Sequence, residues 1–229
     1  MGEGIFSRFD RLVVLDTETT GIRHREDEII ELGYLRIDGA GTVEMEEDEL
    51  ILLSPGRRLP PEIARLTGIE EETIRLRGVE KRQAAERFVR ALSGPRVLVA
   101  AYNAQFDLCF LYYFLYRLGL ADALRGACFL DVLTVYRDRR PYPHRLTDAA
   151  ASYGVAVEGA HRALEDVKTT LAVLRAMERE ENDLEQYINL FGYNPRYGVS
   201  GPRISSVRYE PQPYGTREKL YRRPACAGV

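Results

Sequence analysis

Three short segments of the sequence carry side chains that could hold divalent cations and activate water. Asp16 and Glu18 lie in the first segment, Asp107 in the second, and His161 and Asp166 in the third. Carboxylate oxygens are the ligands that hard divalent cations prefer. An imidazole with a pKa near ~6.5 can accept a proton at neutral pH. Four carboxylates and one imidazole therefore form a set suited to phosphodiester hydrolysis assisted by two metal ions.

Asp16 and Glu18 follow a short apolar run, residues 12–15, which is typical of a strand buried in the centre of a sheet. Side chains alternate between the two faces of a strand, so both carboxylates should point the same way and Thr17 the other way. Gly21 would let the backbone approach a ligand closely. The alternative is a solvated turn at the end of a strand, because such a pair of acids is a weak signal alone.

Asn103 and Asp107 follow a second apolar run, residues 97–101. Asn103 is a good residue for the N-cap of a helix, and Asp107 would lie one turn further on, on the same face. Phe106 between them could stack on a terminal base. The alternative is a capped helix in which Asp107 complements the helix dipole and Phe106 belongs to the core.

His161 and Asp166 stand at the start of a strongly periodic stretch, residues 162–180, that predicts a helix. In a catalytic interpretation His161 takes a proton from the attacking water. In a structural interpretation His161 is an exposed loop residue, as we expect for His24, and Asp166 complements the helix dipole.

The three segments, in this order and in these contexts, resemble those of the DEDDh-type 3′→5′ exonucleases. That group includes the proofreading epsilon subunit of bacterial DNA polymerase III and RNase T. The resemblance covers roughly residues 11–177 and extends to the segments 29–33, 66–69 and 144–146. The chain departs from it at Tyr102, where many relatives have His, and a changed packing at the edge of the site is expected there.

The resemblance implies roles for individual residues. Asp16, Glu18 and Asp166 would bind two divalent ions, Mg²⁺ or Mn²⁺, with Asp16 bridging them, and Asp107 would act at the second ion. His161 would be the base, and nucleoside 5′-monophosphates would leave one at a time from a 3′ end, most readily a single-stranded one. The residues expected to grip the terminal nucleotide are Thr19, Leu66, Asn103 and Phe106.

The pattern of elements predicts an α/β fold with a mixed central sheet and helices on both faces. The resemblance implies that this is the RNase H-like fold. Strands are expected over 12–15, 28–38, 42–53, 97–101 and 128–130, with a hairpin at 39–41. Helices are expected over 62–66, 79–92, 104–118, 146–153 and 162–180.

Composition indicates a soluble protein with a real core. The chain has 229 residues, of which 45% are hydrophobic and 29% charged. We expect no signal peptide before residue 11 and no membrane span. Three widely spaced cysteines, none in a CxxC pair, indicate reduced thiols and a cytoplasmic location. A net charge of −3 argues against a protein that coats DNA through bulk electrostatics.

Charge and periodicity divide the chain into an exonuclease domain, residues 1–181, and a C-terminal segment, residues 182–229. From residue 194 onward there are seven basic and two acidic residues, a net charge of +5, which leaves −8 on the rest. The periodicity ends after Gly192, so we expect an extended or partly disordered arm that is rich in Tyr, Pro and Gly. It could bind nucleic acid or a partner such as a DNA polymerase, or it could be a solvated or self-packed extension.

Three functions remain open at the level of sequence. The preferred one is a DNA-directed exonuclease of proofreading or repair type. An RNA-directed exonuclease similar to RNase T would use the same acidic residues and base, since only contacts to the 2′-OH distinguish the two. The third is a non-catalytic nucleic-acid-binding module on the same fold. Against it stands the cost of clustering like charges without cations.

Overall fold

The computed structural model describes residues 4–157, 162–215 and 218–223. Its main feature is a five-stranded sheet in the order β3-β2-β1-β4-β5. The strands are β1 (Arg11–Thr19), β2 (Ile29–Asp38), β3 (Val43–Leu50), β4 (Val97–Ala101) and β5 (Cys128–Asp131). The first three are antiparallel, whereas β4 and β5 run parallel to β1. The predicted mixed α/β sheet is confirmed.

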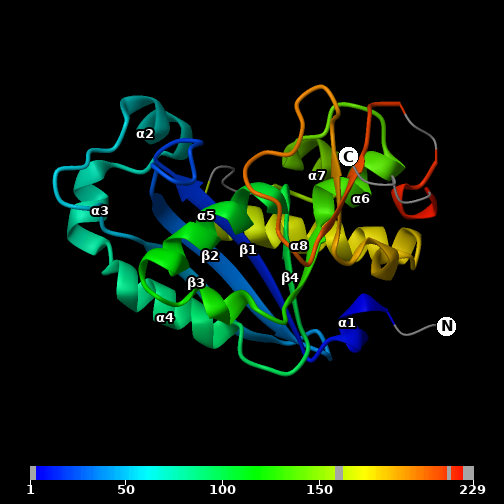
Figure 1. The fold of residues 1–229 in the computed structure, drawn as a ribbon, viewed down its shortest axis with the longest axis horizontal. Helices are drawn as coiled ribbons and strands as arrows, with labels where there is room; N and C mark the ends of the chain where they lie inside the picture. The colour runs from blue at the N-terminus through cyan, green and yellow to red at the C-terminus, as the bar shows by residue number, and fades with distance from the viewer. Residues whose placement is uncertain (1–3, 158–161, 216–217, 224–229) are drawn as a thin grey trace.

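Helices cover both faces of this sheet (Figure 1). Helices α4 and α5 pack with the residues of one face, and α1, α6, α7 and α8 pack with those of the other. A smaller cluster joins α2 and α3 to Ile30 of β2. The helices are α1 (Ile5–Arg8), α2 (Pro61–Thr67), α3 (Glu71–Arg77), α4 (Lys81–Ala91), α5 (Ala104–Arg117), α6 (Val132–Arg139), α7 (Leu146–Ser152) and α8 (Ala163–Glu180), with 3₁₀ turns at Ala121–Leu124, Leu184–Tyr187 and Leu220–Arg222.

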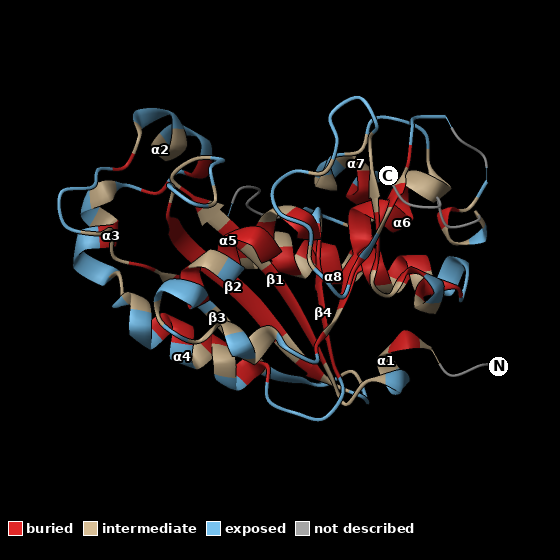
Figure 2. Ribbon diagram, viewed as in Figure 1, coloured by how far each residue is buried: buried red, intermediate tan, exposed pale blue. Residues whose placement is uncertain are grey.

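Strand β1 shows why the two sides of the sheet receive different functional residues. Leu12 and Val14 belong to the cluster on the α8 side, and Val13 and Leu15 to the cluster on the α5 side. Strands β1, β2, β4 and β5 are mostly buried between these two layers, whereas β3, at the edge of the sheet, is largely exposed or half-buried (Figure 2). Continuing the alternation directs Asp16 and Glu18 toward α8 and Thr17 toward α5.

Most predicted elements are present, but three helices of the described ranges, α1, α3 and α6, were missed, and one helix begins later than expected. The helix predicted to begin at residue 79 begins at Lys81, because Val79 instead pairs with Ile51 in a parallel bridge. Helix α6 follows β5 with no linker, so periodicity gave no break between them. Helix α3 is short and lies between Glu70 and Gly78.

Asn103 occupies the N-cap position of α5 as predicted, but its side chain makes no capping hydrogen bond in the described chain. Its backbone is left-handed, with φ of 69°. The buried carboxylate of Asp131 takes over, accepting hydrogen bonds from the N–H groups of Asn103 and Ala104, each at 3.0 Å. Asp131 also accepts one from Leu133 N–H. One carboxylate therefore caps both α5 and α6.

The described part of the C-terminal segment packs against the rest of the molecule. Strands β6 (Leu190–Tyr193) and β7 (Arg208–Pro211) form a separate parallel pair. Gln212 donates to the carbonyl of Thr134 at 2.9 Å and to Asp138 at 2.7 Å. Of the alternatives left by the sequence, these contacts fit a self-packed extension. The division into residues 1–181 and 182–229 stays a prediction.

Among the helices of the described ranges, none combines the length and the apolar character needed to cross a membrane.

Gly33 allows α8 to approach the sheet closely at the functional end of β1. It lies opposite Asp16 in the β1–β2 ladder. A Cβ at this position would lie 2.5 Å from the backbone nitrogen of Leu164 and 2.6 Å from the carbonyl carbon of Ala163. Backbone atoms cannot move aside as a side-chain tip can, so glycine is required there.

We therefore expect Gly33→Val to displace the first turn of α8 and to lower the free energy of unfolding by about 1–3 kcal/mol. Thermal and urea denaturation would measure the loss. The matched control is Gly39→Ala, whose added carbon would lie 3.3 Å from its nearest neighbour, the carbonyl oxygen of Phe9. Equal stability of Gly33→Val and the wild type would contradict this account of the α8–β2 contact.

Candidate active site

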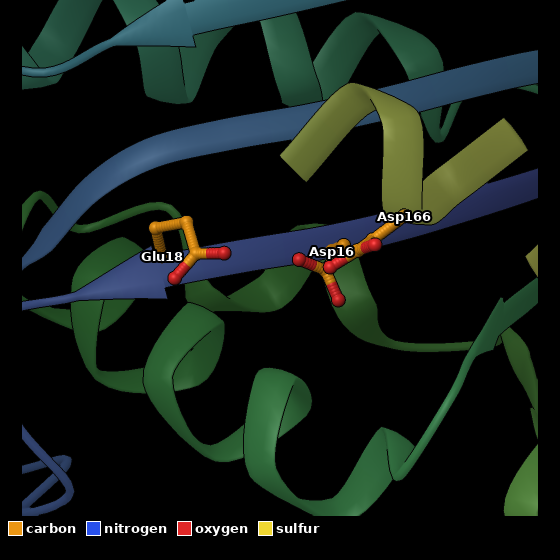
Figure 3. A group of neighbouring side chains, drawn as sticks. All are labelled: Asp16, Glu18 and Asp166. Carbon is orange, nitrogen blue, oxygen red and sulfur yellow. The ribbon is translucent and has the colours of Figure 1, made fainter. Parts of the chain in front are cut away.

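Three of the predicted carboxylates meet where β1 ends and α8 begins. Asp16 and Glu18 project from β1 and Asp166 from the first turn of α8 (Figure 3). Each offers a carboxylate oxygen, and these oxygens all lie within 4.8 Å of one another. The spacing of the pair in sequence thus places both on the face that α8 covers.

Burial and mutual repulsion both oppose ionisation of this cluster. Burial raises the pKa of Asp16 well above its usual range, and the nearby charges of Asp107, Glu18 and Asp166 raise it further. Burial and the charges of Glu31 and Asp166 raise the pKa of Glu18 to about 8. A cluster that resists its own negative charge is one that a bound cation would stabilise.

Asp107 lies on the other side of β1 from this cluster and is held by Thr17. The N–H and the hydroxyl of Thr17 donate to Oδ1 of Asp107 at 3.0 and 2.8 Å. Burial raises the pKa of Asp107 to about 7, although the two bonds from Thr17 act in the opposite direction. The structure thus brings Asp16, Glu18 and Asp166 together, with Asp107 next to them but outside the group of three.

A fifth acid, Glu31, fixes the helix that carries Asp166. It is fully buried on β2, opposite Glu18. Its Oε1 accepts hydrogen bonds from Nε and Nη2 of Arg162 at 2.9 and 2.7 Å, and its Oε2 accepts one from Ala163 N–H at 2.9 Å. Sequence analysis gave Glu31 no role, although an acid within the apolar run 29–35 was a signal that it needed a partner.

The four residues predicted to grip a nucleotide have different degrees of exposure. Leu66 on α2 is 53% exposed, Asn103 is exposed at the start of α5, and Phe106 is half-buried in its first turn. Thr19 is buried, and its hydroxyl donates to Gly21 O at 2.6 Å, which shapes the turn after β1. Phe106 also packs on Phe110, with ring centroids 4.9 Å apart.

His161, the predicted base, lies outside the described residues. His24 is half-buried rather than exposed as expected, with its ring stacked on Tyr113 at 5.5 Å. The Tyr102 hydroxyl donates to the carbonyls of His144 and Arg145 at 3.0 and 3.1 Å. The departure at Tyr102 therefore ties the end of β4 to the start of α7.

The donor set fits divalent cations. It consists of carboxylate oxygens only, which hard ions such as Mg²⁺ and Mn²⁺ prefer. The oxygens converge from two elements, and burial together with the nearby negative charges raises the pKa values of Asp16 and Glu18. A mixed sheet with convergent acids where its first strand ends is typical of nucleases that use metal ions.

Sequence comparison gives the family. An exonuclease family model matches residues 13–174, which is more than half of the chain. The chain therefore belongs to this exonuclease family, of the DEDDh 3′→5′ type that its motifs resemble.

Three curated relatives illustrate the range of the family. The chain is 28% identical to the DNA polymerase III subunit epsilon of Treponema pallidum over 172 residues, 71% of this chain and 74% of that protein. It is 33% identical to an uncharacterized exonuclease of Escherichia phage 186, over 74% of this chain and 89% of the other. It is 31% identical to a putative bifunctional exonuclease/endonuclease of Mycobacterium tuberculosis, over 93% of this chain but only 34% of that protein.

Solved structures of exonuclease I share the fold. E. coli exonuclease I in complex with a dA16 oligonucleotide superposes with a TM-score of 0.69 at 21% identity, over 78% of this chain and 42% of that one. Exonuclease I from Methylocaldum szegediense gives 0.67 at 25% identity, over 76% and 41%. The chain thus spans less than half of these enzymes, and the likeness supports the predicted RNase H-like fold.

If the three carboxylates bind cations, Mg²⁺ or Mn²⁺ should stabilise the folded protein. At a concentration about a hundred times the dissociation constant the gain is about 2.7 kcal/mol, which corresponds to a rise in Tm of several degrees. Asp16→Asn should abolish the rise and increase Tm in EDTA, because it removes one of the repelling charges. The control is Asp122→Asn, an exposed acid remote from the cluster, which should respond as the wild type does. A metal-induced shift that survives Asp16→Asn would refute the cation site.

Proposed function

We propose that the protein is a metal-dependent 3′→5′ exonuclease that degrades DNA to nucleoside 5′-monophosphates. The observation that carries the proposal is the meeting of Asp16, Glu18 and Asp166 within 4.8 Å at the end of β1, in a chain of the exonuclease family. Clustering these acids would be costly for a module that binds no cation, which argues against a non-catalytic role.

Asp16, Glu18 and Asp166 would hold two divalent ions. When bound, such ions acidify the attacking water and stabilise the charge on the leaving 3′-oxygen. Asp107, which is turned toward Thr17, would act on the second ion through an intervening water. Glu31 would position Asp166 indirectly, because it holds the first turn of α8 through Arg162 and Ala163.

Other residues would carry out the remaining steps. His161 would accept the proton of the attacking water. Phe106, half-buried and backed by Phe110, would stack on the terminal base, with Leu66 and Asn103 exposed on neighbouring elements. Stacking tolerates any base, which suits an enzyme that removes nucleotides in succession.

DNA is the proposed substrate because several relatives are subunits or forms of DNA polymerase III. A polymerase or another replication or repair protein is the proposed partner on the same ground. The proposed compartment is the cytoplasm, since Cys109 and Cys128, the two described cysteines, are unpaired.

The first test is a degradation assay on 5′-labelled single-stranded DNA and RNA of matched sequence. With Mg²⁺ or Mn²⁺ we expect a ladder that shortens from the 3′ end, faster on DNA, and no reaction in EDTA. Asp16→Ala should slow the reaction on the order of a thousandfold or more, since several kcal/mol of stabilisation by metal ions are lost. Undiminished activity of Asp16→Ala would refute the metal assignment. A faster RNA ladder would move the enzyme to the exoribonucleases.

His161 can be tested separately from metal binding. His161→Ala should lower kcat by about 10²–10⁴, the usual contribution of a general base. Stabilisation by Mn²⁺ in thermal denaturation should be retained, because the three carboxylates remain. Wild-type kcat in this variant would exclude His161 as the base, whereas loss of the Mn²⁺ effect would point to a role at the metal ions.

A further inference from the structure

The loop between β6 and β7, residues 194–207, lies across the first turns of α5. Gln105, one residue before Phe106, donates through Nε2 to the carbonyls of Ser200 and Pro202 at 2.8 and 2.9 Å. The Tyr209 hydroxyl donates to Oε1 of Gln105 at 2.6 Å. The amide of Gln105 therefore joins the β6–β7 loop to the helix that carries Phe106.

Gly201 completes this junction. Its φ of 77° is left-handed, and a Cβ there would lie 2.6 Å from the ring of His24 and 3.1 Å from Sγ of Cys109. At Gly201 the β6–β7 loop therefore packs both against Cys109 of α5 and against His24 in the segment that follows β1. Contacts this close hold the loop in one place beside the candidate active site.

Beyond this junction the loop and α5 form the walls of a groove of about 660 Å³. Tyr112 and Tyr116 lie on the helical side, 41% and 62% exposed, with their rings stacked at 5.9 Å and 21°. Residues Pro202 to Ser206 form the other wall. Two exposed, parallel tyrosine rings offer flat apolar faces of the kind on which bases stack.

The groove also carries positive charge. The guanidinium of Arg203 lies over the rings of Tyr193 and Tyr209, 6.0 and 5.4 Å from their centroids. Arg196 lies on the same loop, outside the lining of the groove, with its guanidinium 5.6 Å from the centroid of the Tyr197 ring. Neither arginine forms an ion pair with another residue in the described ranges. Both can therefore neutralise phosphates without giving up an acidic partner.

We propose that the β6–β7 loop and this groove bind the single strand that leads to the 3′ end in the active site. Tyr112 and Tyr116 would stack on bases, and Arg203 and Arg196 would contact the backbone. Helix α5 connects the two sites, since Phe106 and Tyr116 are ten residues apart on it, or about 15 Å along its axis. The inference rests on the proposed function and deepens it.

A nucleic acid fits this surface better than a peptide does. Stacked aromatic rings with adjacent arginines recur where proteins hold single strands without reading sequence. The basic loop also offsets the acidic body, which by itself would repel the strand upstream of the metal ions. A strand whose end reaches Phe106 must leave the site over some surface, and this groove adjoins the same helix.

The test uses full-length protein with Tyr116→Ala and Arg203→Ala, each compared with Arg179→Ala, which removes an exposed charge from the far end of α8. On a longer DNA strand we expect Tyr116→Ala to raise KM about tenfold, the loss of one stacked base. Its kcat should be unchanged. Arg203→Ala should reduce the slope of log affinity against log salt by about 0.7, the value for one phosphate of a single strand.

Two shorter substrates separate this proposal from the proposed function. Hydrolysis of a trinucleotide and of the p-nitrophenyl ester of thymidine 5′-monophosphate should be the same in all four proteins. If the wild type hydrolyses none of these substrates, the proposed function fails. In that case fluorescence anisotropy would measure binding of the longer strand to Asp16→Asn, with and without each groove substitution. This measurement tests whether the groove binds the strand, independently of hydrolysis.

Unchanged binding of the long strand by both groove variants would overturn the proposal. A peptide would then be the better candidate for the partner that binds the groove. An equal loss on the trinucleotide and on the long strand would also overturn it, because the substitutions would then act through the active site. Loss confined to the long strand in either variant supports it, provided that far-ultraviolet circular dichroism shows a folded protein.

Discussion

The ion pair and hydrogen bonds between Glu31 and the start of α8 are the interactions on which the rest of the site depends. A carboxylate on a central strand would be costly to bury alone, and the guanidinium of Arg162 and the N–H of Ala163 satisfy both of its oxygens. This contact is possible only because Gly33 lets the helix backbone come against the sheet. Asp166 is thereby held close to Asp16 and Glu18. The charges of these acids repel one another, and this repulsion contributes to the raised pKa values of Asp16 and Glu18. The paired carboxylate of Glu31 on β2 thus holds Asp166 beside the carboxylates of β1, which repel one another.

The two faces of β1 divide the acids between two helices. Asp16 and Glu18 face α8, whereas Thr17 turns to α5 and holds Asp107. Asp107 is thus held by hydrogen bonds outside the group of three, although its charge still raises the pKa of Asp16. Asp131 supports this position of Asp107 by capping α5 at its first turn. Because α5 also carries Phe106, the position of the proposed base platform depends on a buried acid of β5.

Local periodicity was sufficient for the sheet and the main helices, and the alternation along one strand was sufficient to place Asp16 and Glu18 on one face. That Asp166 meets them followed only from the family resemblance. Local patterns were insufficient wherever a long-range partner replaces a local one. Asn103 looks like an N-cap, but Asp131, distant in sequence, performs that task. Val79 looks helical, but Ile51 draws it into a bridge. The role of Glu31 in holding α8 could not be predicted, because it depends on Arg162, which is distant in sequence.

The C-terminal segment shows the same limit on a larger scale. Its lack of periodicity predicts an extended or partly disordered arm. Its described residues are instead held by side-chain hydrogen bonds, such as those of Gln105 and Gln212, which no periodicity encodes. Because that packing sets two tyrosines and an unpaired arginine beside the helix of Phe106, basic charge is placed where an acidic body needs it. A cluster of carboxylates repels a phosphate backbone wherever no cation lies between them. A nuclease with such a centre gains from a separate, cationic and aromatic surface upstream, and the β6–β7 loop provides one.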